Sequence, residues 1–357
     1  MDTDDPPPTT PDDRGGQPAG DERREREQAE SLTRIEAGGI PMSAERRLKV
    51  LSTGNGAFTS GLSVGDYALL DRLGPRPLAQ VLGASVHQVG WQFLPPPNQW
   101  GGELFCELDM VARAWDQARR RALDRLTEEA QAVGADAVVG VNLRRGEHDW
   151  AAGSVDFVVA GTAVRLPGSP GGGWPILSDL SVADYWKLQQ SGYAPVGLVA
   201  ATAVFFVSPS SQTQWTRYAT TARNQELTDF TRGFYAARET ALRYISSQAD
   251  SNKATGIVGV RIDQSARHES YHVAGYAQPQ TGGVLGTRQQ LGGFGARQQL
   301  GGLGGGLGGG QQQGSDQERS GLAITLHAVG TAIREVEDTP QYPPETVISQ
   351  GVTADDR

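Results

Sequence analysis

The chain has little of what marks a secreted or membrane protein. Its single cysteine, Cys106, cannot form an intramolecular disulfide, and a structural zinc site built of cysteine alone would need four. The longest apolar run, VGLVAATAVFFV at 196–207, is well short of the roughly 20 residues that span a bilayer. The opening MDTDDPPPTTPDD is acidic and lacks the basic and apolar regions of a signal peptide. These absences predict a cytoplasmic protein with no membrane partner.

Excess positive charge is also missing. The formal net charge is -9 and the pI is about 5.2, and no stripe of Lys and Arg interleaved with aromatic residues occurs. We therefore expect no nucleic-acid partner. The glycine-rich tract lacks the G-K-[ST] ending of a phosphate-binding loop, and no nucleophile elbow is present. No enzyme class is indicated by these motifs.

The chain does contain an internal repeat. LSVGDY at 62–67 recurs as LSVADY at 180–185, which is 118 residues further on. ARRRALDRL at 118–126 and VVGV at 138–141 recur 119 residues later as ARETALRYI and IVGV. AGTAVR at 160–165 recurs 169 residues later as VGTAIR. Four landmarks in one order predict a tandem duplication with an insertion late in the second copy.

Each copy predicts the same β-α-β-β unit. In the first copy the expected elements are a strand at 78–89, an amphipathic helix at 108–133, and strands at 135–144 and 155–166. In the second copy they are a strand at 196–207, a helix at 227–248, and strands at 255–263 and 321–334. A right-handed crossover would make the first two strands of each unit parallel neighbours, and the last two an antiparallel hairpin. The expected class is α+β, with a three-stranded sheet and one long helix in each unit.

A sheet covered by one helix leaves its other face bare. This face must be buried against the sister copy or another chain, so the pattern predicts a pseudo-symmetric pair and a homo-oligomer. Charges on the first helix, Arg119 and Glu129 among them, are expected on the solvent side.

The expected domain boundaries follow from composition. Residues 1–39 form a charged tail, disordered to about residue 20, in which 21–37 is either a charged helix or a solvated, partly helical segment. The first copy covers 40–168 and the second covers 174–336. A Gly/Gln-rich insertion at 278–318 and a final tail at 337–357 are expected to be disordered and to offer contacts to other proteins.

Several of these segments together resemble a known family. LGASVHQVGWQ, ARRRALDRL, VGADAVVGV, RGEHDWAAG and FVVAGTAV follow one another in the order seen in the YbjQ-like family of heavy-metal-binding domains. The likeness is strong over 40–167 and weaker over 174–335. It implies a compact β-α-β-β unit that assembles into oligomeric rings, and it supplies no catalytic residue. The second copy departs from the pattern, because Lys253 replaces Gly134, Thr255 replaces Asp136 and Phe205 stands where His87 does.

The motif HESYH at 268–272 matches the H-E-x-x-H of zinc proteases. That chemistry requires a helix, which places both histidines on one ion and the glutamate beside the attacking water. Here the motif follows a strand and aligns with the polar hairpin GEHDW of the first copy. On a strand, His268 and His272 would lie about 13 Å apart, too far for one ion. A chance match in a hairpin is therefore the favoured interpretation, with the protease as the alternative.

A mixed metal site is the second candidate. Imidazole, thiolate and carboxylate groups together suit a divalent transition metal such as zinc. The candidate ligands are His87, Cys106, Glu147, His148 and Asp149. Each has a simpler alternative: His87 as a strand residue facing solvent or an interface, Cys106 as a small buried hydrophobe, and GEHDW as a polar hairpin anchored by Trp150.

Five glycines have structural roles in this interpretation. Gly134 follows the first helix, where a left-handed backbone is needed. The others recur in strands of both copies, as Gly140 with Gly259 and Gly161 with Gly330, which predicts bulges or close backbone contacts. The sequence thus predicts a non-enzymatic oligomeric module that binds a metal or small ligand in its first copy. The alternative is a structural scaffold that binds no metal.

Overall fold

The computed structural model describes residues 18–53, 57, 59–90, 92–94, 104–146, 153–211, 213, 224–272 and 318–336. The first 17 residues of the expected tail, nearly all of the Gly/Gln-rich insertion, the final tail and the hairpin residues 147–152 lie outside these ranges. No helix in the described part is long and apolar enough to cross a membrane.

The first unit consists of strand β1 (Arg76–Gln88), helix α4 (Asp109–Ala132) and strands β3 (Ala137–Gly146) and β4 (Ser154–Arg165). The second unit consists of β6 (Tyr193–Ser208), α7 (Thr228–Ser251), β7 (Gly256–His272) and β8 (Glu318–Glu335). The α+β class and the strand-helix-strand-strand order therefore agree with the expectation. Alanines at four-residue steps let each long helix lie close to its sheet: Ala118, Ala122 and Ala130 in α4, and Ala237, Ala241 and Ala249 in α7, are buried.

The expected parallel pairing is wrong in both units. The strand orders are β1-β4-β3-β5 and β2-β6-β8-β7, so the last strand of each unit lies between the other two. It pairs antiparallel with both, as β4 does with β1 and β3, and β8 with β6 and β7. The first two strands remain parallel to each other but are not neighbours, because the helix connection crosses over the third strand.

Each sheet has a fourth strand that comes from the other half of the chain. Strand β2 (Leu104–Glu107) precedes α4 in the first half but pairs antiparallel with β6. Strand β5 (Ile176–Leu177) begins the second half but pairs parallel with β3. The two sheets therefore exchange edge strands, which the sequence did not predict.

Equivalent hydrogen bonds recur in the two halves. The hydroxyl groups of Ser60 and Thr162 are 3.2 Å apart, and those of Ser178 and Thr331 are 3.1 Å apart. The amide of Leu82 donates to Glu129, and the amide of Ala200 donates to Gln248 in the same way. These matches extend the repeated sequence landmarks to local geometry.

The repeated glycines occupy matching backbone conformations. Gly140 and Gly259 have φ of 62° and 65°, and each lies at a register shift between two strands. Gly134 follows α4 with φ 71°, and its counterpart Lys253 follows α7 with φ 54°. A Cβ on Gly161 would lie 2.6 Å from Val138, and one on Gly330 would lie 2.9 Å from Ile257. Bulky residues are excluded there because neighbouring strand side chains occupy the space.

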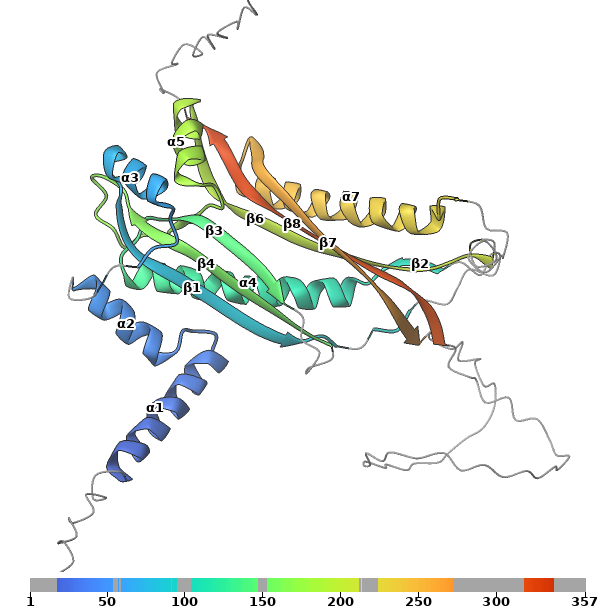
Figure 1. Cartoon of the computed structure of the whole chain (residues 1–357), viewed down its shortest axis with the longest axis horizontal. Coiled ribbons are helices and arrows are strands. Elements are labelled where there is room, and N and C mark those ends of the chain that lie inside the picture. The colour runs from blue at the N-terminus through green and yellow to red at the C-terminus, as the bar shows by residue number, and fades with distance from the viewer. Residues whose placement is uncertain are drawn as a thin grey trace, which may run out of the picture.

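Helix α4 packs between the two units (Figure 1). One side contacts β1 and β4, and the other contacts β6, whose Val204 and Phe206 belong to the first unit's hydrophobic core. Arg119 and Glu129 are consequently buried, each about 3% exposed, and not on a solvent face as expected. The second unit covers the side of α4 that the first sheet leaves open. The bare face expected for one of the two sheets is thus filled within the chain.

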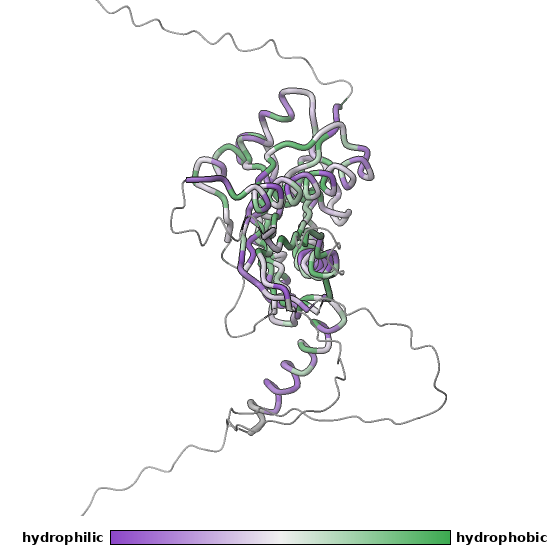
Figure 2. Tube along the Cα trace, turned by 90° about the vertical axis from the view of Figure 1, so that its right-hand side faces the viewer, coloured by the Kyte–Doolittle hydropathy of each residue, from purple (hydrophilic) through white to green (hydrophobic). Residues whose placement is uncertain are grey.

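Short helices complete the described part: α1 (Pro18–Glu36), α2 (Met42–Ser52), α3 (Val64–Leu73) and α5 (Val182–Gln190). Helix α1 is the charged helix that was one of two expectations for this segment. It extends away from the sheets and is mostly hydrophilic, whereas the central strands are largely hydrophobic (Figure 2). Helices α3 and α5 begin with the repeated serines, since Ser63 and Ser181 each accept a hydrogen bond from the amide three residues later. The repeated LSVGDY and LSVADY are therefore helix N-termini.

Candidate functional site

Of the residues expected to bind a metal, the two that the structure describes, His87 and Cys106, lie in different sheets. His87 is half-buried on β1, opposite Val155 of β4. Burial and the nearby guanidinium groups of Arg121 and Arg125 lower its pKa. Cys106 is half-buried on β2, opposite Phe206 of the second sheet. Glu147, His148 and Asp149 lie outside the described residues.

The described donors do not fit a metal site. Over the described ranges, no group of three or more His, Cys, Asp or Glu side chains could hold one ion. Burial raises the pKa of the Cys106 thiol to about 11, whereas metal coordination requires the thiolate. The two arginines beside His87 would also repel a cation. His87 and Cys106 therefore have the properties of an edge-strand histidine and a small buried hydrophobe.

The HESYH motif lies within strand β7 and not in a hairpin turn. His268 pairs with Leu322 and His272 with Glu318 on β8, so the segment is extended. Successive side chains point to opposite faces of a strand, which separates Glu269 from both histidines. The arrangement of a zinc protease, with two histidines and a glutamate around one ion, is absent from this strand.

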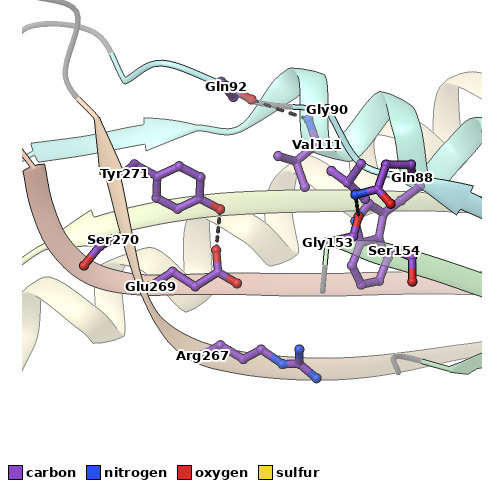
Figure 3. A pocket seen from close by; sticks show the side chains of 12 residues that line it. Gln88, Gly90, Gln92, Val111, Gly153, Ser154, Arg267, Glu269, Ser270 and Tyr271 are labelled. Atoms are coloured by element: carbon purple, nitrogen blue, oxygen red, sulfur yellow. Dashed lines mark hydrogen bonds between the residues drawn. The ribbon is translucent and has the colours of Figure 1, made fainter. Parts of the chain in front are cut away.

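Glu269 and Tyr271 instead face a cavity of about 460 Å³ between β7 and the first unit (Figure 3). The Tyr271 hydroxyl donates a hydrogen bond to the Glu269 carboxylate. Burial and this carboxylate both raise the pKa of Tyr271, so the phenol stays protonated. Gln88, Val111 and Trp115 line the opposite side. The Trp115 indole Nε1 is buried and has no hydrogen-bond partner among the described residues.

A buried polar cluster joins the two units beside this cavity. The Arg119 guanidinium lies 2.6 Å from the Asp116 carboxylate and donates to the Thr202 hydroxyl at 3.0 Å. The His327 imidazole lies between two further groups, with Nδ1 2.8 Å from Thr202 Oγ1 and Nε2 3.2 Å from Arg145 Nη1. Since a guanidinium can only donate, Nε2 accepts and Nδ1 carries the proton.

The histidine in this cluster is held neutral. Burial and the charges of Arg145 and Arg119 lower the pKa of His327 well below its ordinary value. The imidazole stacks on the Trp115 ring at 4.9 Å and meets the Phe157 ring edge-on at 5.9 Å. Helix α4 and strands β3, β4, β6 and β8 all contribute side chains to this cluster, which therefore connects the two units.

A second cavity of about 440 Å³ opens from the cluster between β3 and β7. Four arginines line it: Arg119, Arg144, Arg145 and Arg261. Asp263 is the acidic lining residue, and its carboxylate lies 3.8 Å from Arg145. Arg119 and Arg261 also have acidic partners, Asp116 at 2.6 Å and Asp179 at 3.2 Å, so among the described residues Arg144 is the lining arginine without one. This remaining positive charge suits a small anion better than a metal ion.

Sequence reasoning missed this cluster because its members come from both halves. Arg119 sits next to Ala118 within the apolar stripe of the helix, and that position was the available signal. His327 and Thr202 lie in apolar strands, where a lone polar residue indicates a buried partner. Only the packing of the two units shows what those partners are.

Comparisons with known proteins place residues 101–167 in a family described as "Putative heavy-metal-binding". The chain is 35% identical over 252 residues to the encapsulin nanocompartment protein Rv1762c of Mycobacterium tuberculosis. The matched stretch covers 68% of this chain and 92% of that protein.

Two archaeal UPF0145 proteins show shorter similarities. One from Methanococcus maripaludis is 43% identical over 60 residues, and one from Halobacterium salinarum is 42% identical over 69 residues. They match 17% and 19% of this chain, which spans 52% and 61% of their own lengths. No solved structure matches the chain significantly.

Proposed function

Since the chain belongs to the YbjQ-like family and is related over 68% of its length to the encapsulin nanocompartment protein Rv1762c, we propose that it is a non-enzymatic assembly module that forms homo-oligomers. The two units are, in this proposal, tandem copies of one domain. The second copy has retained the fold, but it has Lys253 in place of Gly134 and Phe205 in place of His87.

The observation that supports this proposal is the exposure of apolar side chains on the outer face of the first sheet. Leu82 and Val86 on β1 are 44% and 58% exposed. Their counterparts on β6, Ala200 and Val204, are only 5% and 2% exposed, and Val204 belongs to the first unit's hydrophobic core. Exposed apolar side chains on one sheet, at positions that are buried on the other, support a missing partner of the same kind.

Light scattering on the full chain tests this proposal. The expected mass is a multiple of the 38.0 kDa chain mass. Closed particles of one size should appear by electron microscopy, in keeping with the name of the mycobacterial relative. A 38.0 kDa monomer at micromolar concentration would contradict the proposal.

A second candidate function is supported by the arginine-lined cavity. In this alternative the module binds a small anion between β3 and β7. Arg144 is exposed and lines the cavity, so Arg144→Gln removes one charge with little effect on the fold. Calorimetric titration with inorganic phosphate should give binding to the natural chain that weakens about tenfold in this variant, and heats at the level of dilution for the natural chain would exclude it.

A further inference from the structure

The junction between the two units shows how a unit uses its edges. The outer edge of β3 receives the segment 176–180, in which Ser178 donates its amide to Val138 at 2.9 Å. In return, the amides of Gly140 and Val141 donate to Leu180 and Ser178 at 3.0 and 2.9 Å. The outer edge of β6 receives β2 and the start of α4, where Leu108 donates its amide to Val204 at 2.7 Å.

The equivalent edge of each of the other two strands, β7 and β1, has no partner strand in the described sheets. Strand β7, the counterpart of β3, is the last strand of its sheet as described, and β1, the counterpart of β6, is the last strand of the other. Val260 is 39% exposed, whereas its counterpart Val141 is 1% exposed under the segment 176–180. Gly259 has the same bulge conformation as Gly140, which turns the next amides toward the open edge.

The matching segments are also available. Thr59, Ser60 and Leu62 are the counterparts of Leu177, Ser178 and Leu180, and Ser60 makes the same contact with its own unit through Thr162. Residues 224–226 are the counterparts of 105–107, and they are exposed and belong to no strand. Leu227 has φ -89° and ψ 80°, close to the -91° and 72° of Leu108, so the backbone that leads into α7 is already set for pairing.

The unpaired edges and segments of the second unit match those of the first unit of another chain, and not those of another second unit. The second unit offers the β7 edge and residues 224–226, and the first unit offers segment 59–62 and the β1 edge. We infer that two chains join head to tail, with segment 59–62 of one copy adding in parallel to β7 of the next, and residues 224–226 pairing with the end of β1. This inference rests on the proposed homo-oligomer and specifies its contact.

The N-terminal helices limit where the second chain can bind on β1. Arg47 of α2 donates to the Gln80 carbonyl at 3.4 Å. Arg125 of α4 donates to the Ala84 carbonyl at 2.5 Å and also to the Ile35 carbonyl of α1 at 2.9 Å, so it holds α1 beside this part of β1. Within the chain, β2 and Leu108 pair with Val204 of β6 and the residues that follow it. The counterparts of these residues on β1 begin at Val86 and His87. The contact therefore lies beyond the part of β1 that is covered by α1 and α2. A heterologous contact of this kind closes into a ring or continues as a filament.

Disulfide trapping tests the register of the contact. Val138 and Leu177 are paired across β3 and β5, so their counterparts Ile257 and Thr59 should lie opposite each other between chains. In a Cys106→Ser background, Thr59→Cys with Ile257→Cys should give covalent multimers on a non-reducing gel. The matched control, Thr59→Cys with Ser247→Cys on the exposed outer side of α7, should stay at the mass of one chain.

An edge substitution tests the same contact without a cross-link. Val260→Lys places a charge at an exposed position that the contact would bury, so the fold is retained and association weakens at least about 100-fold. Ala266→Lys, exposed on the same strand beyond the matched edge, should leave the mass by light scattering unchanged. If the natural chain is oligomeric but Val260→Lys has no effect and no multimers are trapped, the head-to-tail contact is wrong and the proposed function stands. If the natural chain is itself a 38.0 kDa monomer, both are wrong.

Discussion

Replacing His327 is expected to change the pH dependence of stability in a defined way. The folded chain holds this imidazole neutral, because it is buried between Arg145 and Arg119 and its Nδ1 already donates to Thr202. The charged groups around it come from three elements, with Arg145 on β3, Arg119 on α4 and Asp263 paired with Arg145 from β7. Protonation would place a third cation in this cluster.

The sign of the effect follows from the lowered pKa. The unfolded chain binds a proton at His327 below about pH 6.5, whereas the folded chain does not. The contribution of the neutral imidazole to stability is therefore complete above pH 6.5 and is lost as the pH falls. Between pH 6.5 and pH 5 this single site should reduce the unfolding free energy by up to about 2 kcal/mol, at no more than about 1.4 kcal/mol per pH unit.

The variant His327→Asn isolates the contribution of His327 to the pH dependence of the unfolding free energy. The asparagine amide can occupy the position of Nδ1 and still donate to Thr202, but it does not titrate. Urea unfolding at pH 7 and pH 5 should show a smaller loss of unfolding free energy in the variant than in the natural chain, by up to about 2 kcal/mol. His268→Gln, at an exposed position of β7, serves as the control and should follow the natural chain. Identical pH slopes for the His327 variant and the natural chain would refute the role assigned to the cluster.

Three further predictions concern single positions. Lys253 has a left-handed backbone, so Lys253→Gly should raise the unfolding free energy by about 0.5 kcal/mol. Gly134→Lys should lower it by about 1 kcal/mol, because φ at this position is 71°. Chemical denaturation of both variants checks this pair of predictions. Cys106, with its pKa raised from 9.0 to about 11, should react with iodoacetamide at pH 8 about 100-fold more slowly in the folded chain than in urea, and equal rates would contradict its burial. His87→Ala combined with Cys106→Ala should leave the metal content of untagged protein unchanged by mass spectrometry, and a loss of bound metal would assign these two residues as ligands.

The main helices and strands could be predicted because their signals are local. Alanine spacing in α4 and α7 and the valine-rich strands each specify one element without reference to the rest of the chain. The repeated landmarks set the order of these elements in both halves. The parallel pairing failed for a general reason: the crossover rule gives the relative direction of β1 and β3, but it does not exclude a later strand from the space between them.

The exchanged strands could not be predicted from their own sequences. β2 and β5 are four and two residues long, and neither has a periodic pattern that a sequence can display. What places β2 is the partner, since Glu107 accepts a hydrogen bond from Tyr244 and Phe105 contacts the Phe205 ring at 5.4 Å. The candidate metal site stays a prediction, because Glu147, His148 and Asp149 lie outside the described residues; of its described members, His87 lies on β1 of one sheet and Cys106 on β2 of the other.

The contact between the two units of one chain and the proposed contact between two chains differ in their polar residues. Within the chain, the buried Arg119 pairs with the half-buried Asp116 beside Thr202, and such a pair is costly to separate. At the open end their counterparts are Tyr235 and Arg238, both exposed, and the counterpart of Thr202 is Ala84. In the separated chains Tyr235 and Arg238 are exposed to water, so separating a contact built on these positions leaves no buried charge unpaired. Substituting Arg119 should therefore lower the folding stability of each chain, whereas substituting Arg238 should change only the affinity between chains.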